Sequence, residues 1–404
     1  MWLSNIEGLD AVLLLSCMTG TSFDAFDVAA ADVALDGDTL TLRPEGFVSS
    51  PIPLMLREAI AGILPPGQCG VGDVCRLDAE LGRAAGATLA AAARELSVDP
   101  EAVVWSGQTV HHWVEGGRVR GTLQIGRSAY IAEATGLPVI ADLRARDVAC
   151  GGQGAPLVSL VDVLILADEA SACRRPVAAL NLGGISNITV VRPNGPPLAY
   201  DVGPANALVD AAARMVTGGD WQCDVDGRLA SMGTTSPQLL ARLLDDPYLG
   251  QTPPKTTGKE RYHAGFLETV CEGLALSSHD LLATVTEHAA EIVSREVTRH
   301  DVARLFVAGG GVRNPALMAA LRSKVPGVDV ISTDRLGLPA QAKEALAFAV
   351  VGFLTWHGLP GNLPSCTGAA HPALLGTLTP GREPLALPVP VRRAPRRLVV
   401  LPGR

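Results

Sequence analysis

Two carboxylates lie close together in a glycine-containing turn near the start of the sequence. In SCMTGTSFDAFDV, which follows an apolar run, Gly20, Thr21 and Ser22 are typical of a loop that binds phosphate through backbone amides. Asp24 and Asp27 would repel a bare phosphate, so a cation such as Mg²⁺ must separate them from it, directly or through water. The stretch predicts a site for a metal–nucleotide complex, with a plain hairpin turn bearing solvated acids as the alternative.

A second group of polar side chains lies in ADLRARDVACGGQGAPLV, residues 141–158. Its glycines and proline leave little regular structure, which is typical of a specialised loop. Gln153 carries both amide donors and a carbonyl acceptor, which suit sugar hydroxyls or an N-acetyl group. Arg144 could form paired hydrogen bonds to a carboxylate. We predict a sugar-binding loop, with a structural glycine loop and a surface arginine as the alternative.

Two further acids are candidates for chemistry. Asp201 in AYDVGPANALVD is predicted at a strand end, where a carboxylate can act as a general base or simply brace the turn. Asn206 is predicted to cap the helix that follows. Glu344 in QAKEALAFA lies on a helix with an apolar face, and it is either solvated or directed into a site.

Two glycine turns could meet a nucleotide without side-chain obstruction. Gly183 and Gly184 in NLGGISN suit phosphates, and Gly309, Gly310 and Gly311 in VAGGGVRN suit adenine or ribose. Neither GxxxxGK[ST] nor GxGxxG occurs, so the P-loop and Rossmann fingerprints are lacking. The basic stretch PKTTGKERYH is predicted to be a surface loop or a lid contact.

The elements that position these residues alternate between strand and helix, which predicts α/β architecture. The apolar run 11–17 and the segment 26–35 are expected to form a hairpin, and 177–191 repeats its plan of strand, glycine turn and strand. This repetition suggests a duplicated domain. Helices are expected at 51–64, 74–96, 207–216, 264–299 and 341–356.

The composition excludes several classes of protein. The 404 residues are 48% hydrophobic and 18% charged with a net charge of −8, which favours a globular protein and disfavours nucleic acid as a partner. The eight cysteines form no CxxC pair and no HExxH occurs, so a structural zinc site is not expected. No basic leader or membrane-length apolar run is present, which predicts a reduced, cytoplasmic enzyme without a membrane partner. Residues 381–404, rich in Pro and Arg, are predicted to form a poorly ordered tail, with a docking segment for acidic partners as the alternative.

Several of these motifs occur together in one order. They are CMTGTSFDAFD, GQTVHH, TLQIG, ADLRARDVACGGQGAPLV, LNLGGISN, YDVGPANALVD, PKTTGKERY, GGGVRNPALM and PGNLPSCTGA. From about residue 12 to 380 the chain resembles the anhydro-N-acetylmuramic acid kinases, in the sugar-kinase/actin-like ATPase superfamily.

The resemblance implies a two-lobed actin-like ATPase fold, with a duplicated ribonuclease-H-like core and a central nucleotide cleft. The N-terminal lobe, with the first phosphate loop, would span 1–137 and be joined by about 360–380. The C-terminal lobe, with the sugar loop, the catalytic Asp and the adenosine glycines, would span 138–359, and 381–404 would be the tail.

The resemblance also implies an activity. The family uses MgATP to phosphorylate O6 of 1,6-anhydro-N-acetylmuramic acid while water opens the anhydro bridge, giving N-acetylmuramic acid 6-phosphate in cell-wall sugar recycling. Asp201 resembles the general base, and Arg144, Gln153 and Glu344 resemble substrate residues. The glycine turns and the loop from Gly20 to Asp27 resemble the nucleotide site. The expected partners are the sugar and ATP, and a homodimer is left open.

The sequence departs from the family pattern at several positions. Ala25 and Ala205 stand where the family commonly has glycine, and Ser106 stands in the histidine position of SHGQT. A serine cannot titrate in place of histidine. Two alternatives therefore stay open: a kinase of another anhydro sugar such as levoglucosan, and a non-catalytic nucleotide-binding protein of the same fold.

Overall fold

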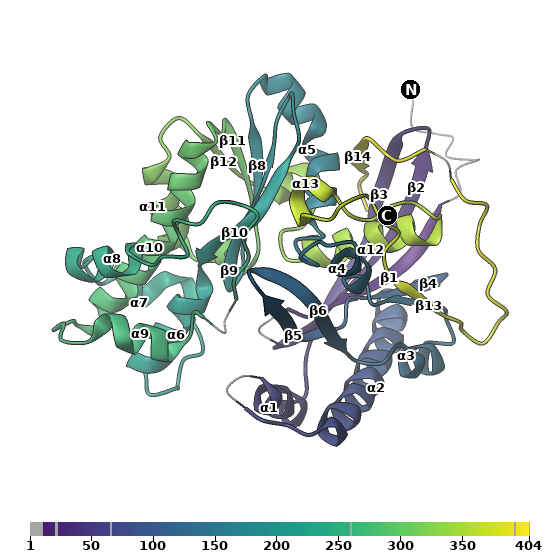
Figure 1. Ribbon diagram of the computed structural model, residues 1–404, viewed down its shortest axis with the longest axis horizontal. Coiled ribbons are helices and arrows are strands. Elements are labelled where there is room, and N and C mark those ends of the chain that lie inside the picture. Colours follow the sequence, from purple (N-terminus) through teal and green to yellow (C-terminus); the bar gives the residue numbers. More distant parts are fainter. Residues whose placement is uncertain (1–10, 21–22, 65–66, 259–260, 392, 404) are drawn as a thin grey trace. The chain divides into compact units, whose positions relative to one another are not determined.

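The computed structural model describes residues 11–20, 23–64, 67–258, 261–391 and 393–403 (Figure 1). Packing divides the chain into two compact units. Unit 1 comprises Met1–Ile165 and Leu336–Arg404, and unit 2 comprises Leu166–Arg335. The lobe boundaries expected near residues 137 and 360 stay a prediction.

Unit 1 is built on a seven-stranded sheet. Its first two strands form the predicted antiparallel hairpin, and the first strand also pairs in parallel with residues 102–105. In spatial order the strands are β13 (Thr377–Thr379), β7 (Val139–Ala141), β4 (Ala102–Trp105), β1 (Val12–Met18), β2 (Ala25–Asp36), β3 (Thr39–Pro51) and β14 (Arg397–Val400).

Helices cover both faces of this sheet. Alternate residues of β1 and β2 point to opposite faces, so each strand contributes to two hydrophobic cores. One core contains α12 (Lys343–Trp356) and the start of α5 (Ser159–Cys173), and the other contains α1 (Leu54–Ile63), α2 (Val71–Glu95) and α3 (Ser128–Thr135).

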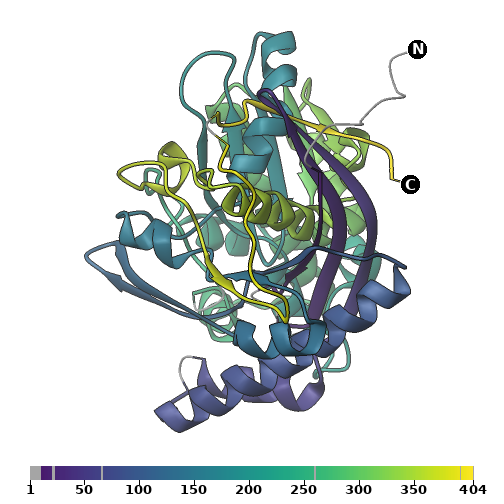
Figure 2. The same cartoon turned by 90° about the vertical axis from the view of Figure 1, so that its right-hand side faces the viewer.

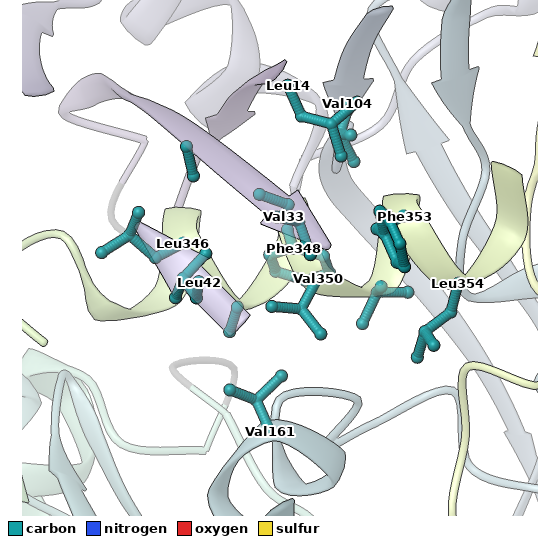
Figure 3. Close-up of a cluster of buried hydrophobic side chains, with 14 of the residues drawn as sticks. Leu14, Val33, Leu42, Val104, Val161, Leu346, Phe348, Val350, Phe353 and Leu354 are labelled. Atoms are coloured by element: carbon teal, nitrogen blue, oxygen red, sulfur yellow. The ribbon is translucent and has the colours of Figure 1, made fainter. Parts of the chain in front are cut away.

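The helix α12 is the centre of the first core. Figure 2 shows it beside the purple strands, and Figure 3 shows Phe348 and Val350 packed near Val33 of β2 and Val161 of α5. Each such side chain stabilises the fold by about 1.5–3 kcal/mol when fully buried. The helix therefore holds one face of the sheet together although it lies far from β1 and β2 in the sequence.

Unit 2 repeats the strand order of unit 1. Its sheet runs β10 (Leu198–Pro204), β9 (Ile185–Val191), β8 (Val177–Leu182), β11 (Arg304–Ala308) and β12 (Asp329–Ser332). The first three strands pair antiparallel, whereas β8–β11 and β11–β12 are parallel. When the strands of each sheet are counted along the chain, their spatial order in unit 2 is third, second, first, fourth, fifth. The strands β3, β2, β1, β4 and β7 of unit 1 follow the same order. This shared topology confirms the expected α/β fold with a duplicated ribonuclease-H-like core.

The helices of unit 2 differ from prediction in two respects. The helices α7 (Arg228–Ser231) and α8 (Pro237–Leu244) were not predicted, and one predicted helix is divided into two. The expected helical region 264–299 is interrupted, since Gly273 adopts a positive φ of 73° and Ser277 caps a new helix by accepting from the Asp280 N–H. The helices are α6 (Asn206–Val216), α7 (Arg228–Ser231), α8 (Pro237–Leu244), α9 (Ala264–Cys271), α10 (Ser278–Arg299) and α11 (Pro315–Lys324). No helix in the described ranges is long and apolar enough to span a bilayer.

Short elements complete the two units. Those that carry site residues or lie beside them are β5 (Gln108–Glu115), β6 (Arg118–Ile125), α4 (Ala145–Ala149), α13 (Pro364–Thr367) and the 3₁₀ turn η2 (Gly310–Arg313). The strands β5 and β6 form a separate two-stranded sheet in unit 1.

The C-terminal tail corrects a prediction. Its strand β14 runs parallel to β3 and pairs Leu398 with Leu40. Leu398 is 4% exposed and belongs to the core around α12, whereas the neighbouring Val399 is 41% exposed. The prediction of a poorly ordered tail was wrong here, because the apolar residues near the C-terminus add a strand to the sheet edge.

Leu398→Ala is expected to lower the free energy of unfolding by about 2 kcal/mol or more, because it deletes a buried side chain. Val399→Ala is the matched control and should change it by about 0.5 kcal/mol. Urea unfolding followed by tryptophan fluorescence measures both. Equal effects of the two substitutions would show that β14 does not pack into the core.

Candidate active site

The first predicted phosphate loop connects β1 and β2 in unit 1. Thr21 and Ser22 lie outside the described residues, so their contact with a nucleotide stays a prediction. The chain turns at Phe23, which has a φ of 42° and whose N–H donates to the Gly20 carbonyl at 3.0 Å. Ala25 is already the first residue of β2 and has no positive φ, so an alanine is compatible with this turn.

The segment after β4 holds this loop. The Thr19 N–H donates to Ser106 Oγ at 3.4 Å, and the Thr19 hydroxyl donates to the Gly107 carbonyl at 3.2 Å. Gln108 Nε2 donates to the Gly20 carbonyl at 3.3 Å. Ser106, at the position where the family resemblance expects histidine, therefore supports the backbone of the predicted phosphate loop, a role that needs a hydrogen-bond acceptor and no titration.

Asp24 and Asp27 offer oxygen donors beside this loop. Asp24 is exposed and its Oδ1 accepts from the Ala25 N–H at 3.1 Å, whereas Asp27 is half-buried and accepts from the Ser49 hydroxyl at 2.6 Å. Within the described ranges no three His, Cys, Asp or Glu residues gather as a metal site. Magnesium is usually held by one or two carboxylates together with phosphate oxygens and water, and these two acids fit that chemistry.

Glu344 lies in the electrostatic neighbourhood of two other predicted site residues. Alternate residues of β2 face α12, and Asp27 belongs to this alternating set. Glu344 lies in the first turn of α12. Burial raises the pKa of Glu344, the charges of Asp27 and Asp162 raise it further, and Lys343 and Arg144 oppose the shift. The structure thus brings Asp27, Arg144 and Glu344 together within unit 1.

A buried ion pair holds the start of α12. Lys343 Nζ lies 2.6 Å from Asp162 Oδ1 of α5, and their side chains are 4% and 5% exposed. Breaking such a pair by removing one partner costs about 3–5 kcal/mol. Sequence reasoning missed this pair, although an aspartate inside the apolar run LVSLVDVLILA was a signal. The pair fixes the helix turn that carries Glu344.

In the predicted sugar loop, Arg144 and Gln153 each form a hydrogen bond within the protein. An Arg144 guanidinium N–H donates to the Gly154 carbonyl at 2.8 Å, and the guanidinium lies 5.8 Å from the ring centre of Phe348 in α12. Gln153 Oε1 accepts from the Val119 N–H of β6 at 3.3 Å. Gln153 therefore also has a structural role, which the sequence did not indicate.

Asp147 is the residue that fixes this loop, and sequence reasoning did not select it. Its side chain is fully buried. It accepts from the Gly154 N–H at 2.8 Å, from Asn362 Nδ2 at 2.6 Å and from the Thr367 hydroxyl at 2.7 Å. The Gln153 N–H also donates to the Thr367 carbonyl at 2.9 Å. These bonds join the sugar loop to the segment PGNLPSCTGA.

The predicted base lies in unit 2 on the edge strand β10. Asp201 pairs with Asn187 of β9, and the register shifts between Asp201 and Gly203. The expected strand end is therefore a bulge inside a strand, which redirects the chain locally. The Asp201 carboxylate accepts at Oδ2 from the Thr256 hydroxyl at 2.7 Å and from the Thr257 N–H at 3.0 Å.

The NLGGISN turn packs against the start of α6. The Gly184 carbonyl accepts from the Ala205 N–H at 2.9 Å, and the Gly183 carbonyl accepts from the Asn206 N–H at 3.1 Å. Asn206 Nδ2 donates to the Leu182 carbonyl at 3.0 Å, so the predicted capping by Asn206 was wrong, and Ala205 occupies the cap position. Ala205 has a φ of −117° and a ψ of −103°.

The three glycines after β11 differ in their surroundings. A Cβ on Gly309, whose φ is 88°, would overlap Asn181, and one on Gly311 would lie 2.7 Å from Leu182 Cβ. The nearest atom to a Cβ on Gly310 lies 4.0 Å away. Packing against β8 therefore explains Gly309 and Gly311, while Gly310 is the position with room for a ligand.

The sequence is similar to a known family over most of its length. A family model described as anhydro-N-acetylmuramic acid kinase matches residues 12–381. A protein of Streptomyces coelicolor named anhydro-N-acetylmuramic acid kinase is 53% identical over 392 residues, covering 96% of this chain and 99% of its own. A protein of Rhodococcus erythropolis with the same name is 48% identical over 394 residues, covering 95% and 98%.

Solved structures give weaker matches. A ROK family glucokinase from Streptomyces griseus, in complex with glucose and AMPPNP, is 13% identical with a TM-score of 0.36, over 84% of this chain and 98% of that one. A ROK hexokinase from Thermus thermophilus is 17% identical with a TM-score of 0.30, over 84% and 97%.

Glu344→Gln is expected to stabilise the protein relative to wild type increasingly as the pH rises from the ordinary glutamate pKa of 4.5 toward the raised pKa of the folded state. The raised pKa means that the native state binds this proton more tightly than the unfolded chain. Wild-type stability is therefore lost as the pH rises above the ordinary value of 4.5, a loss that glutamine avoids. Thermal unfolding at several pH values measures the difference.

The exposed Glu133 provides the control for this experiment. Glu133→Gln should shift the unfolding temperature equally at each pH. A Glu344→Gln variant that behaves in the same pH-independent way would contradict the burial of the Glu344 carboxyl group.

Proposed function

The chain belongs to the anhydro-N-acetylmuramic acid kinase family, and from this membership we propose how its own residues carry out the reaction. The protein is an ATP-dependent anhydro-N-acetylmuramic acid kinase, and a role in cell-wall sugar recycling is consistent with the family. The observation that supports the assignment of residues is the Asp201 carboxylate, which two donors hold at the bulge of β10.

We propose that Asp201 is the general base. It would take a proton from water as the water oxygen attacks the anomeric carbon of the sugar. The bond from that carbon to O6 breaks, O6 keeps the electron pair and attacks the γ-phosphorus of ATP, and ADP leaves. A positioned base of this kind contributes about 10²- to 10⁴-fold to the rate.

We propose backbone turns within each unit as nucleotide-binding elements. In unit 1 the proposed phosphate loop begins at Gly20, and in unit 2 the turn at Gly183 and Gly184 and the open position at Gly310 offer backbone without side-chain obstruction. Asp24 and Asp27 would hold a magnesium ion, in part through water. When bound, the ion neutralises charge on the phosphates.

The sugar would contact the loop that Asp147 fixes. We propose that Arg144 binds the lactyl carboxylate and that the amide donors of Gln153 bind the N-acetyl group or a hydroxyl. Glu344 has a raised pKa, so in its protonated form it can donate as well as accept a hydrogen bond to a sugar hydroxyl.

Asp201→Asn should reduce kcat by at least about 10²-fold and leave folding and ATP binding unchanged, because asparagine keeps the shape but cannot accept the proton. The exposed Asp220, changed to Asn, is the control and should keep full activity. The assay is sugar-dependent ADP release, with ATP binding followed by calorimetry. Near-normal turnover of Asp201→Asn would exclude Asp201 as the base.

Arg144→Ala should raise the KM for 1,6-anhydro-N-acetylmuramic acid by about tenfold or more, because a charge-assisted hydrogen bond contributes about 1.5–3 kcal/mol. The KM for the corresponding sugar without the lactyl group should change much less. Arg146, exposed in the same segment, gives the control Arg146→Ala. Equal increases for both sugars would refute a contact between Arg144 and the carboxylate.

A further inference from the structure

The stretch PKTTG lies between α8 and α9, and the proposed reaction assigns it no role. We propose that residues 255–257, with Tyr248, are a positioning element that orients the Asp201 carboxylate toward the attacking water. This inference depends on the proposed function, because it takes Asp201 as the base. The residues of this element act through Asp201 and are not themselves catalytic.

Three consecutive residues contact Asp201. The Lys255 carbonyl accepts from the Asp201 N–H at 3.2 Å, the Thr256 hydroxyl lies 2.7 Å from Oδ2, and the Thr257 N–H lies 3.0 Å from the same oxygen. One bond thus fixes the backbone, and two fix the rotation of the carboxylate. Thr256 is exposed, as expected for a residue beside the place where a base meets its water.

Tyr248 completes the contacts on the backbone. Its hydroxyl donates to the Asp201 carbonyl at 2.8 Å. Burial raises the pKa of Tyr248, and the charge of Asp201 raises it further, so the hydroxyl stays protonated and remains a donor. Because β10 is the last strand of its sheet, these bonds pair backbone groups of Asp201 with the 248–255 segment.

Lys255 anchors the positioning element from inside. Its side chain is buried, and Nζ donates to the carbonyls of Tyr248 at 3.4 Å and Leu249 at 3.3 Å. It also lies 4.7 Å from the ring centre of Tyr248. Burial lowers the pKa of Lys255. A lysine held in this way restrains residues 256 and 257 and is unlike the solvated lysine of a surface loop.

A second cluster ties the two ends of this loop together. The buried Asp246 accepts from the Tyr248 N–H at 3.0 Å, from the Tyr262 hydroxyl at 2.7 Å and from the Arg261 guanidinium. Burial alone would raise the pKa of Asp246, but these donors outweigh burial and lower it. Asp246 therefore joins the two ends of the loop, and Thr256 and Thr257 between them bind Asp201.

The test compares Thr256→Val with Thr256→Ser. Valine keeps the shape and removes the hydroxyl, so we expect kcat to fall by about tenfold to a hundredfold while the KM values for sugar and ATP stay within about twofold. Serine keeps the hydroxyl and should restore kcat to within about twofold of wild type. Tyr248→Phe should also lower kcat, and Asp201→Asn is measured in parallel.

Three results would overturn the inference while leaving the base in place. These are normal kcat in Thr256→Val, equal losses in the valine and serine variants, and a raised KM for ATP without loss of kcat, which would indicate a nucleotide contact. Retained activity of Asp201→Asn would instead refute the base itself, and the positioning element with it. Circular dichroism of each variant confirms that losses of kcat do not come from unfolding.

Discussion

The parallel pairing of the first and fourth strands determines where each unit can bind a ligand. Parallel neighbours end at the same edge of a sheet, so the turns that follow them meet there. In unit 1 this brings Thr19 to Ser106 and Gly20 to Gln108, and in unit 2 it brings the 182–184 turn to Gly309 and Gly311. Both glycine turns follow from the same topological constraint, applied twice.

The protein also buries polar groups whose burial is costly unless they are paired. Asp147 is fully buried, yet it accepts from a backbone amide, an asparagine and a threonine. Lys343 and Asp162 form an ion pair in which each neutralises the charge of the other, inside the core that contains α12. Each of these groups fixes a segment that carries a proposed substrate residue. The cost of burying them is offset by hydrogen bonds and an ion pair that hold those segments in place.

Much of the fold could be predicted because its strongest elements have simple patterns. The apolar β1 and the hairpin with β2 follow from periodicity, and the long α2 follows from its alanine-rich helical pattern. The strand β3 was missed because Pro44 and Gly46 interrupt its pattern opposite an irregularity in β2. The bulge at Asp201 could not be predicted, since strand register depends on the partner strand.

Because unit 1 is made of two separate chain segments and unit 2 of one, the two units become complete at different times during synthesis. Unit 2 is one continuous segment, so all of its strands are available once residue 335 has left the ribosome. Unit 1 has to wait for α12, which fills one of its cores, and for β13 and β14, which complete both edges of its sheet. The N-terminal hairpin is made first and yet is enclosed last. Until then its apolar strands lack the helix that covers one face of their sheet.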